Sequence, residues 1–135
     1  MAELIWGDKN ALGFRGIDDE HKELFEAVRA IESAMARTAE PAAMGALLKK
    51  LVAAAGTHFA SEEAMMREAK YPGLALHAAN HQRLIEKVEA FAARHGQGGV
   101  AVNQHAVTFL RDWLLHHIES DDARLGAWLK EHAPR

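Results

Sequence analysis

The 135-residue sequence contains no cysteine, which excludes disulfide bonds, thiolate metal sites and cysteine nucleophiles. It also has no excess of basic residues: the formal net charge is −3, so no global positive field would attract nucleic acid or an anionic membrane. No apolar stretch reaches the roughly 18 residues that a membrane span needs, and residues 1–10 lack the apolar run of a signal peptide. We therefore expect a cytoplasmic protein that neither binds nucleic acid nor inserts into a membrane.

Proline is rare, at 3 residues, and alanine is abundant, so helix is favoured along almost the whole chain. Apolar residues recur at helical spacing over residues 17–35, 47–66, 77–91 and 102–118, with a short continuation over 125–129. Asp18 is predicted to cap the first helix, and Pro41 is predicted to lie in the first turn of the second. The pattern predicts an all-α protein: an up-down-up-down four-helix bundle with an extended N-terminal arm over residues 1–16 and a short C-terminal helix. The length suits one domain, residues 1–135.

Histidine is the unusual residue, at 9 copies, and several histidines interrupt the apolar stripes. The residues that stand where the pattern demands an apolar side chain are His21, His58, Glu62, His77, His81 and His117. His58 and Glu62 are four residues apart, as are His77 and His81, so the members of each pair are about 40° apart around the helix and point into one layer.

A single histidine in such a stripe is usually an ordinary core residue, but here all four stripes place one at the same level. An unpaired carboxylate in an apolar interior costs several kcal/mol of desolvation. Imidazole and carboxylate ligands together suit iron, zinc or manganese. The sequence therefore predicts a pair of metal ions bridged by carboxylates. It has neither the Glu-x-x-His of ferritin-like di-iron proteins nor the His-Glu-x-x-His of zinc proteases.

These residues lie in longer motifs that resemble the hemerythrin family, and within it the single-domain bacteriohemerythrins. The motifs are Ile17-Asp18-Asp19-Glu20-His21, His58-Phe59-x-x-Glu62-Glu63-x-x-Met66, Tyr71-Pro72, His77-x-x-x-His81, and Trp113-Leu114-x-x-His117-Ile118 followed by Asp122. The resemblance covers nearly the whole chain, including Trp6 and Gly13. It implies reversible binding of O2 at a non-heme di-iron centre, with two Fe ions joined by an oxo or hydroxo bridge.

The resemblance also implies a role for each ligand. His77, His81 and His117 would hold one iron, and His21 and His58 would hold the other, which keeps an open position for O2. Glu62 and Asp122 would bridge the two ions. Leu24, Phe59 and Leu114 are candidate walls of the O2 pocket.

Two neighbours of these ligands are expected to play no part in the site. The family usually has glutamine directly before the first ligand, whereas Glu20 stands here, and we expect its side chain to face away from the metals. Glu63 lies about 100° from Glu62 around the helix, so we expect it to be solvated.

Helix geometry and the family pattern favour different residues as the second bridging carboxylate. In a regular helix Asp121 lies about 40° from His117, whereas Asp122 lies about 140° away. The family pattern nevertheless favours Asp122. Asp122 can lie in the same layer as His117 only if the helix is broken, kinked or widened between Ile118 and Asp122, so we predict a π-type turn there. Ser120 could compete for backbone hydrogen bonds in that turn. Asp121 would then face solvent or cap the terminal helix.

Three functions fit these observations. The favoured one is a non-enzymatic oxygen carrier or store, because a sensor would need an output domain in the same chain. A di-iron peroxidase or oxidase would need a polar proton donor beside the open iron. An O2- or metal-sensing module that acts through a separate partner would need exposed apolar patches. The expected partner is O2, and the sequence indicates no particular protein partner.

Overall fold

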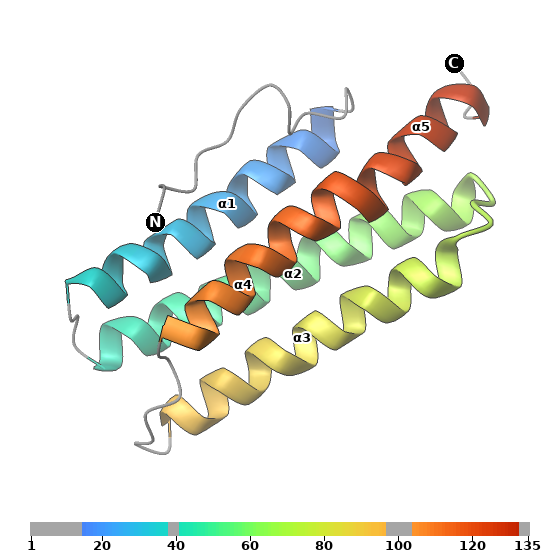
Figure 1. Cartoon of the computed structure of the whole chain (residues 1–135). Coiled ribbons are helices and arrows are strands. Elements are labelled where there is room, and N and C mark those ends of the chain that lie inside the picture. Colours follow the sequence, from blue (N-terminus) through green and yellow to red (C-terminus); the bar gives the residue numbers. More distant parts are fainter. Residues whose placement is uncertain (1–14, 38–40, 97–103, 133–135) are drawn as a thin grey trace.

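A computed structural model of the chain describes residues 15–37, 41–96 and 104–132. Within these ranges the chain forms α1 (Arg15–Ala36), α2 (Pro41–Glu68), α3 (Leu74–Gly96), α4 (Gln104–His116), the π-helix η2 (His117–Asp122) and α5 (Ala123–His132). Successive long helices run in opposite directions, and α4, η2 and α5 together make the fourth rod of the bundle (Figure 1). The predicted up-down-up-down bundle is confirmed. In the described part of the chain, no helix is both long and apolar enough to cross a membrane.

The predicted start is correct for α2 and wrong for α1. Pro41 begins α2, as predicted. The prediction that Asp18 caps α1 is wrong, because α1 begins at Arg15 and Asp18 already lies in its first turn. The earlier start brings Ile17 into the helix, where its side chain is only 2% exposed. Asp18 still places its charge near the positive end of the helix dipole. The predicted arm is wrong at its last two positions, because residues 15 and 16 belong to α1; its other residues, 1–14, lie outside the described residues.

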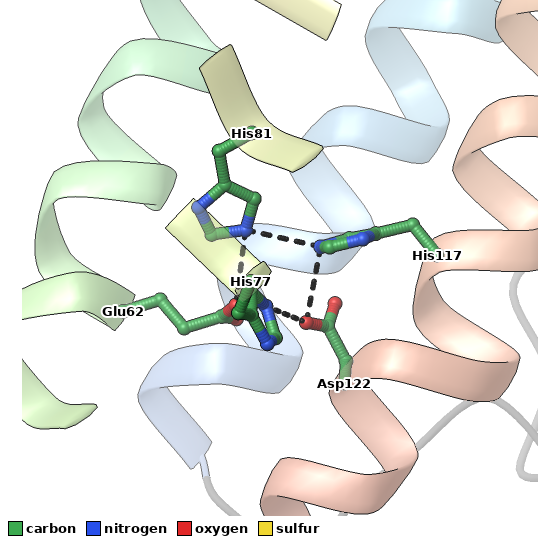
Figure 2. Close-up of side chains that lie close together, drawn as sticks. All are labelled: Glu62, His77, His81, His117 and Asp122. Carbon is green, nitrogen blue, oxygen red and sulfur yellow. Dashed lines mark hydrogen bonds and ion pairs between the residues drawn. The ribbon is translucent and has the colours of Figure 1, made fainter. Parts of the chain in front are cut away.

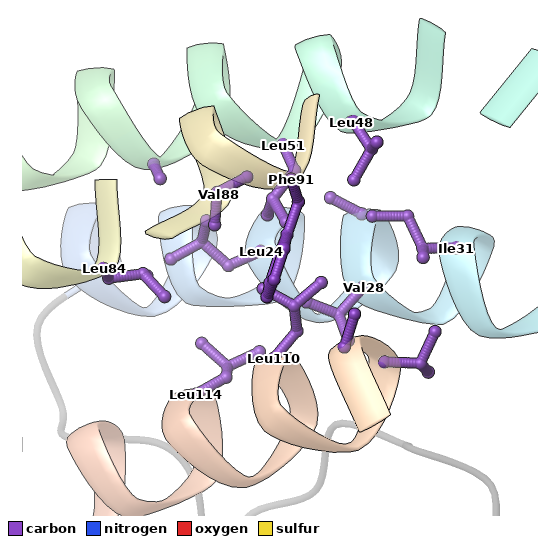
Figure 3. Packing of buried hydrophobic residues seen from close by; sticks show 14 of the residues in the cluster. Leu24, Val28, Ile31, Leu48, Leu51, Leu84, Val88, Phe91, Leu110 and Leu114 are labelled. Atoms are coloured by element: carbon purple, nitrogen blue, oxygen red, sulfur yellow. The ribbon is translucent and has the colours of Figure 1, made fainter. Parts of the chain in front are cut away.

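A layer of buried polar side chains crosses the bundle interior, and Figure 2 shows five of them. Apolar side chains pack on both sides of this layer. On one side is the main core, which includes Leu24, Phe59, Leu114 and Ile118. Figure 3 shows part of it, with Leu24 and Leu114 labelled. On the other side is the end cluster, made of Met66, Leu125 and Leu129, with Tyr71 and Trp128 packed against it. The polar layer is therefore closed off along the bundle axis by two apolar clusters.

The turn after α2 fixes where α3 begins, and hence where His77 enters the polar layer. Lys70 has a φ of 60°, in the left-handed region. The Tyr71 N–H donates to the Met66 carbonyl at 2.8 Å, and the Lys70 N–H donates to the Arg67 carbonyl at 3.2 Å. This pair of hydrogen bonds is the Schellman motif, in which glycine is the usual left-handed residue. Lysine carries a steric cost in that position.

We therefore expect Lys70→Gly to raise the free energy of unfolding by roughly 0.5–1 kcal/mol, the steric relief minus the extra backbone entropy of glycine. Lys49→Gly is the matched control, since Lys49 is an exposed lysine inside α2. There glycine lowers stability by up to roughly 1 kcal/mol. Urea denaturation of both variants provides the measurement. A Lys70→Gly protein as destabilised as Lys49→Gly would contradict the left-handed turn.

Candidate metal centre

All seven side chains expected to hold metal are brought together in the polar layer. They are His21, His58, Glu62, His77, His81, His117 and Asp122, and each is at most 3% exposed. His21 comes from α1, His58 and Glu62 from α2, the next two histidines from α3, and the last two residues from η2. Within the described residues, these are the buried polar and charged side chains of the molecule.

The seven residues divide into two overlapping sets. One contains Glu62, His77, His81, His117 and Asp122, and the other contains His21, His58, Glu62 and Asp122. In each set every residue offers one ligand atom, and these atoms lie within 4.8 Å of one another. Glu62 and Asp122 belong to both sets. The arrangement therefore offers two adjacent ion positions with two shared carboxylates.

The oxygens of Glu62 are split between the two sets. Its Oε1 atom lies 2.6 Å from His77 Nε2 and 3.2 Å from His81 Nε2. Its Oε2 atom lies 3.1 Å from His58 Nε2. One oxygen therefore faces each ion position, as a bridging carboxylate requires.

The oxygens of Asp122 are split in the same way. Oδ1 lies 2.9 Å from His77 Nε2 and 3.2 Å from His117 Nε2. Oδ2 lies 2.8 Å from His21 Nε2. Asp122 and Glu62 thus span the same two positions from opposite helices, α2 and the fourth rod.

The unsatisfied atoms of the layer fit a metal pair. His58 Nε2, His77 Nε2 and all four oxygens of Glu62 and Asp122 are buried, yet none makes a hydrogen bond of acceptable geometry. Buried polar atoms are normally hydrogen-bonded, and leaving them unpaired is costly. Atoms that are close together but not aligned as donors and acceptors are what ligands facing a common ion would show. Imidazole and carboxylate without thiolate suit iron, zinc or manganese.

The π-helix explains how Asp122 reaches the layer. The predicted π-type turn is confirmed, since η2 spans His117–Asp122. The wider turn brings the residue five positions after His117 to the inner face, where a regular helix would place the residue four positions after it. Ser120 Oγ donates to the His116 carbonyl at 2.6 Å, so the expected side-chain competition for the backbone is present.

Three further carboxylates contact the outer sides of the histidines. Glu20 Oε1 lies 2.9 Å from His58 Nδ1, and Glu63 Oε2 lies 2.9 Å from His81 Nδ1. Asp121 Oδ2 lies 3.1 Å from His117 Nδ1. Because a carboxylate can only accept, each imidazole donates its Nδ1–H. We call Glu20, Glu63 and Asp121 the outer carboxylates.

The predictions for these three carboxylates need correction. Glu63 and Asp121 are not solvated: their side chains are 27% and 13% exposed and are hydrogen-bonded. Glu20 stays outside the ligand layer but contacts His58 rather than simply facing away. Positions around a single helix do not show these contacts, because the imidazoles of His58 and His81 reach Glu20 and Glu63 from a neighbouring helix. A metal-bound imidazole needs an acceptor for its second N–H, and this requirement was the signal that could have found them.

Aromatic rings hold two of the imidazoles from the sides. Phe59 stacks on His81 with the ring centroids 3.8 Å apart and the planes 4° from parallel. Trp113 stacks on His117 at 4.5 Å and 18°. These contacts restrict the rotation of both imidazoles, so their Nε2 atoms stay directed into the layer.

Burial and ion pairing act in opposite directions on the charges of the layer. Burial raises the pKa of the Glu62 carboxyl, but the nearby histidines outweigh it and hold the pKa below its usual range. The pKa of Asp122 is likewise lowered by His117, His21 and His77 against the effect of burial. Burial lowers the pKa of His21 and His77, but the carboxylates outweigh it and raise each pKa to about 9. Protonated imidazoles can thus neutralise the carboxylates when no cation does so.

Comparison with known proteins agrees with the geometry. Residues 12–129 match the family described as the Hemerythrin HHE cation binding domain. The chain is 33% identical to a bacteriohemerythrin of Stenotrophomonas maltophilia over 132 residues, which cover 98% of this chain and 85% of that protein. It is 30% identical to myohemerythrin-1 of Phascolopsis gouldii over 87% of each chain. A crystal structure of wild-type hemerythrin superposes with a TM-score of 0.83 at 30% identity, covering 93% of this chain and 97% of that one.

The raised pKa values of His21 and His77 predict how stability depends on pH after chelation of metal. Both values rise from 6.5 to about 9 on folding, so the stabilisation is fully present below pH 6.5 and is lost as the pH rises through 9. We expect the melting temperature of the chelated protein to fall between pH 6.5 and 9. The metal-loaded protein should melt higher and lack this fall, because metal binding displaces the protons. A chelated protein that became more stable over this range would contradict the assignment.

Proposed function

The chain belongs to the hemerythrin family and binds dioxygen at a non-heme di-iron centre, and from this premise we propose that it is a reversible oxygen carrier or store. In the proposed ligand set, His77, His81 and His117 hold one iron ion, and His21 and His58 hold the other. Glu62 and Asp122 would bridge the ions together with an oxo or hydroxo group. When bound, the iron pair supplies a redox-active centre at which O2 can bind reversibly.

The observation that carries the proposal is the unequal number of imidazoles around the two positions. One set offers three imidazoles and the other offers two, while both share the same two carboxylates. The position held by His21 and His58 therefore has fewer protein ligands and can accept a small external molecule. In Glu62 and in Asp122 the two carboxylate oxygens face different ion positions, which supports the bridging roles.

The apolar core beside the polar layer favours a carrier over a di-iron peroxidase or oxidase. An oxidase would need a polar group that delivers protons to the open position. The candidate pocket walls Leu24, Phe59 and Leu114 are apolar, at most 3% exposed, and part of the main core. Apolar walls exclude water and so slow the irreversible oxidation of the centre.

A sensing module would need an apolar surface for its partner. Among the residues that the structure describes, Leu76 is the one exposed large hydrophobic side chain, which gives little support to this alternative. A single domain over residues 1–135 and a cytoplasmic location stay predictions from the sequence.

Metal analysis together with optical spectra tests the proposed function. The expected result is two iron ions per chain and a visible band that appears in air and disappears reversibly on removal of O2. Irreversible bleaching with consumption of a reductant would indicate an oxidase or peroxidase instead. Two zinc ions and no colour change would overturn both functions.

Glu62→Gln tests the bridging role, because it keeps the size of the side chain and removes its charge. We expect the variant to lose most of its iron and its O2-dependent spectrum, since glutamine cannot bridge two cations as a carboxylate does. Glu68→Gln is the control, because Glu68 is an exposed carboxylate near the end of the same helix. Equal iron content per chain in the two variants would count against Glu62 as a bridge.

Leu114→Ala tests the apolar wall. Removal of the side chain opens space for water beside the ligand layer, so the oxygenated protein should oxidise irreversibly several times faster. Leu48→Ala is the control: Leu48 is equally buried in the main core, but it lies ten residues before His58. Both variants lose about 2–5 kcal/mol of stability, but only Leu114→Ala should change the oxidation rate. Equal rates would place Leu114 outside the O2 pocket.

A further inference from the structure

The outer carboxylates follow a regular arrangement. Each one is next to a ligand in the sequence but hydrogen-bonds a different ligand. Glu20 precedes His21 and accepts from His58 on α2. Glu63 follows Glu62 and accepts from His81 on α3. Asp121 precedes Asp122 and accepts from His117. In each pair of adjacent residues, one therefore belongs to the polar layer and the other accepts a hydrogen bond from the outer nitrogen of a histidine in that layer.

The hydrogen bonds determine which nitrogen of each imidazole faces inward. An imidazole that donates Nδ1–H to a carboxylate has its Nε2 lone pair directed to the opposite side of the ring. For His81 and His117 that side faces the ion position that they share with His77, which we call the three-imidazole position. Their Nε2 atoms lie 3.0 Å apart there. For His58 the Nε2 side of the ring faces Glu62 Oε2 at the ion position that His58 shares with His21, which we call the two-imidazole position.

The negative charge of the outer carboxylates acts in addition to their geometry. The side chains of Glu20, Glu63 and Asp121 are only 25%, 27% and 13% exposed, so water screens their charges incompletely. A carboxylate that accepts the Nδ1–H makes the imidazole a stronger electron donor. Stronger donors favour the more positively charged, oxidised state of a bound metal.

We propose that Glu20, Glu63 and Asp121 are positioning residues that orient His58, His81 and His117 and that lower the midpoint potential of the metal pair through their charge. The inference rests on the proposed function for its ligand set. Two outer carboxylates serve the three-imidazole position and one serves the two-imidazole position, so the effect differs between the two ions. The outer carboxylates also retain the metal, because a fixed imidazole dissociates less readily.

Glu63 offers the clearest test. Asp121 also accepts from Asn80 Nδ2 at 3.0 Å and pairs with Arg124, so its replacement would break several contacts at once. Glu63→Gln retains a hydrogen-bond acceptor and removes the charge, whereas Glu63→Leu removes both. Glu68→Gln, on the exposed side of the same helix, controls for the change in net charge.

The orientation is measured on protein loaded with zinc, which is diamagnetic. We expect the Nδ1 proton of His81 to give a far-downfield NMR signal that exchanges slowly with water. The signal should persist in Glu63→Gln at a less downfield position and disappear in Glu63→Leu. If zinc-loaded wild-type protein gave no such signal, or if Glu63→Leu retained it, the orienting role would be overturned.

The charge effect is measured on iron-loaded protein by redox titration and by iron release to a chelator. Glu63→Gln should raise the midpoint potential, and Glu63→Leu should raise it too and release iron about 10–100-fold faster. A merely structural role would lower the melting temperature of Glu63→Gln without changing its potential relative to Glu68→Gln, and this result would overturn the charge effect. Glu20→Gln, compared with Glu23→Gln at an exposed position of α1, repeats the test for His58.

These measurements separate the inference from the proposed function. If the wild-type protein held two irons but bound no O2 reversibly, the carrier function would fail, while the NMR signal and the potential would still report on Glu63. If O2 binding were reversible and the glutamine variant matched its control, the positioning role alone would fail.

Discussion

Two carboxylates and five imidazoles can share a layer without water only if positive charge lies among them. An ionised carboxylate in an apolar interior costs several kcal/mol unless it is paired. Each of the four rods of the bundle contributes to meeting this requirement: α1, α2, α3 and η2 each supply at least one histidine, and α2 and η2 supply the carboxylates. The main core and the end cluster close the layer from both ends, which keeps the charges strongly coupled.

Protons and metal ions compete for this layer. Without metal, protonated His21 and His77 face Glu62 and Asp122, and the fold retains some neutralisation of charge. In the proposed metal-bound state the same nitrogens would be ligands, and the protons would leave. The layer can therefore form before metal enters it, because the helices are also held by an extensive apolar core. This separates the bundle from small domains that fold only around their metal.

Six of the seven buried residues of the polar layer were predictable because their positions break a helical pattern. A histidine or glutamate in an apolar stripe stands out in one helix, and the convergence of four stripes needs no three-dimensional detail. The π-turn was predictable because regular geometry and the family pattern disagreed about Asp121 and Asp122. The contacts of Glu20 and Glu63 depend on how neighbouring helices are rotated relative to each other. The sequence pattern of one helix carries no information about that rotation. The start of α1 was missed because the burial of Ile17, a tertiary contact, outweighs the capping preference of Asp18.

The π-helix also has a consequence for the length of the chain. A π-turn is an α-helix with one inserted residue, and the insertion rotates everything after it by about 100° relative to a continuous helix. The stripe that ends at Leu114 and Ile118 would continue in an unbroken helix toward Asp121 and Trp128, but Asp122 and Leu129 are the buried residues instead. The proposed second bridging carboxylate, Asp122, and the buried face of α5 therefore depend on the same inserted residue. A single-residue deletion in this turn would displace both together, so insertions and deletions here are constrained by the metal layer and by the end cluster at the same time.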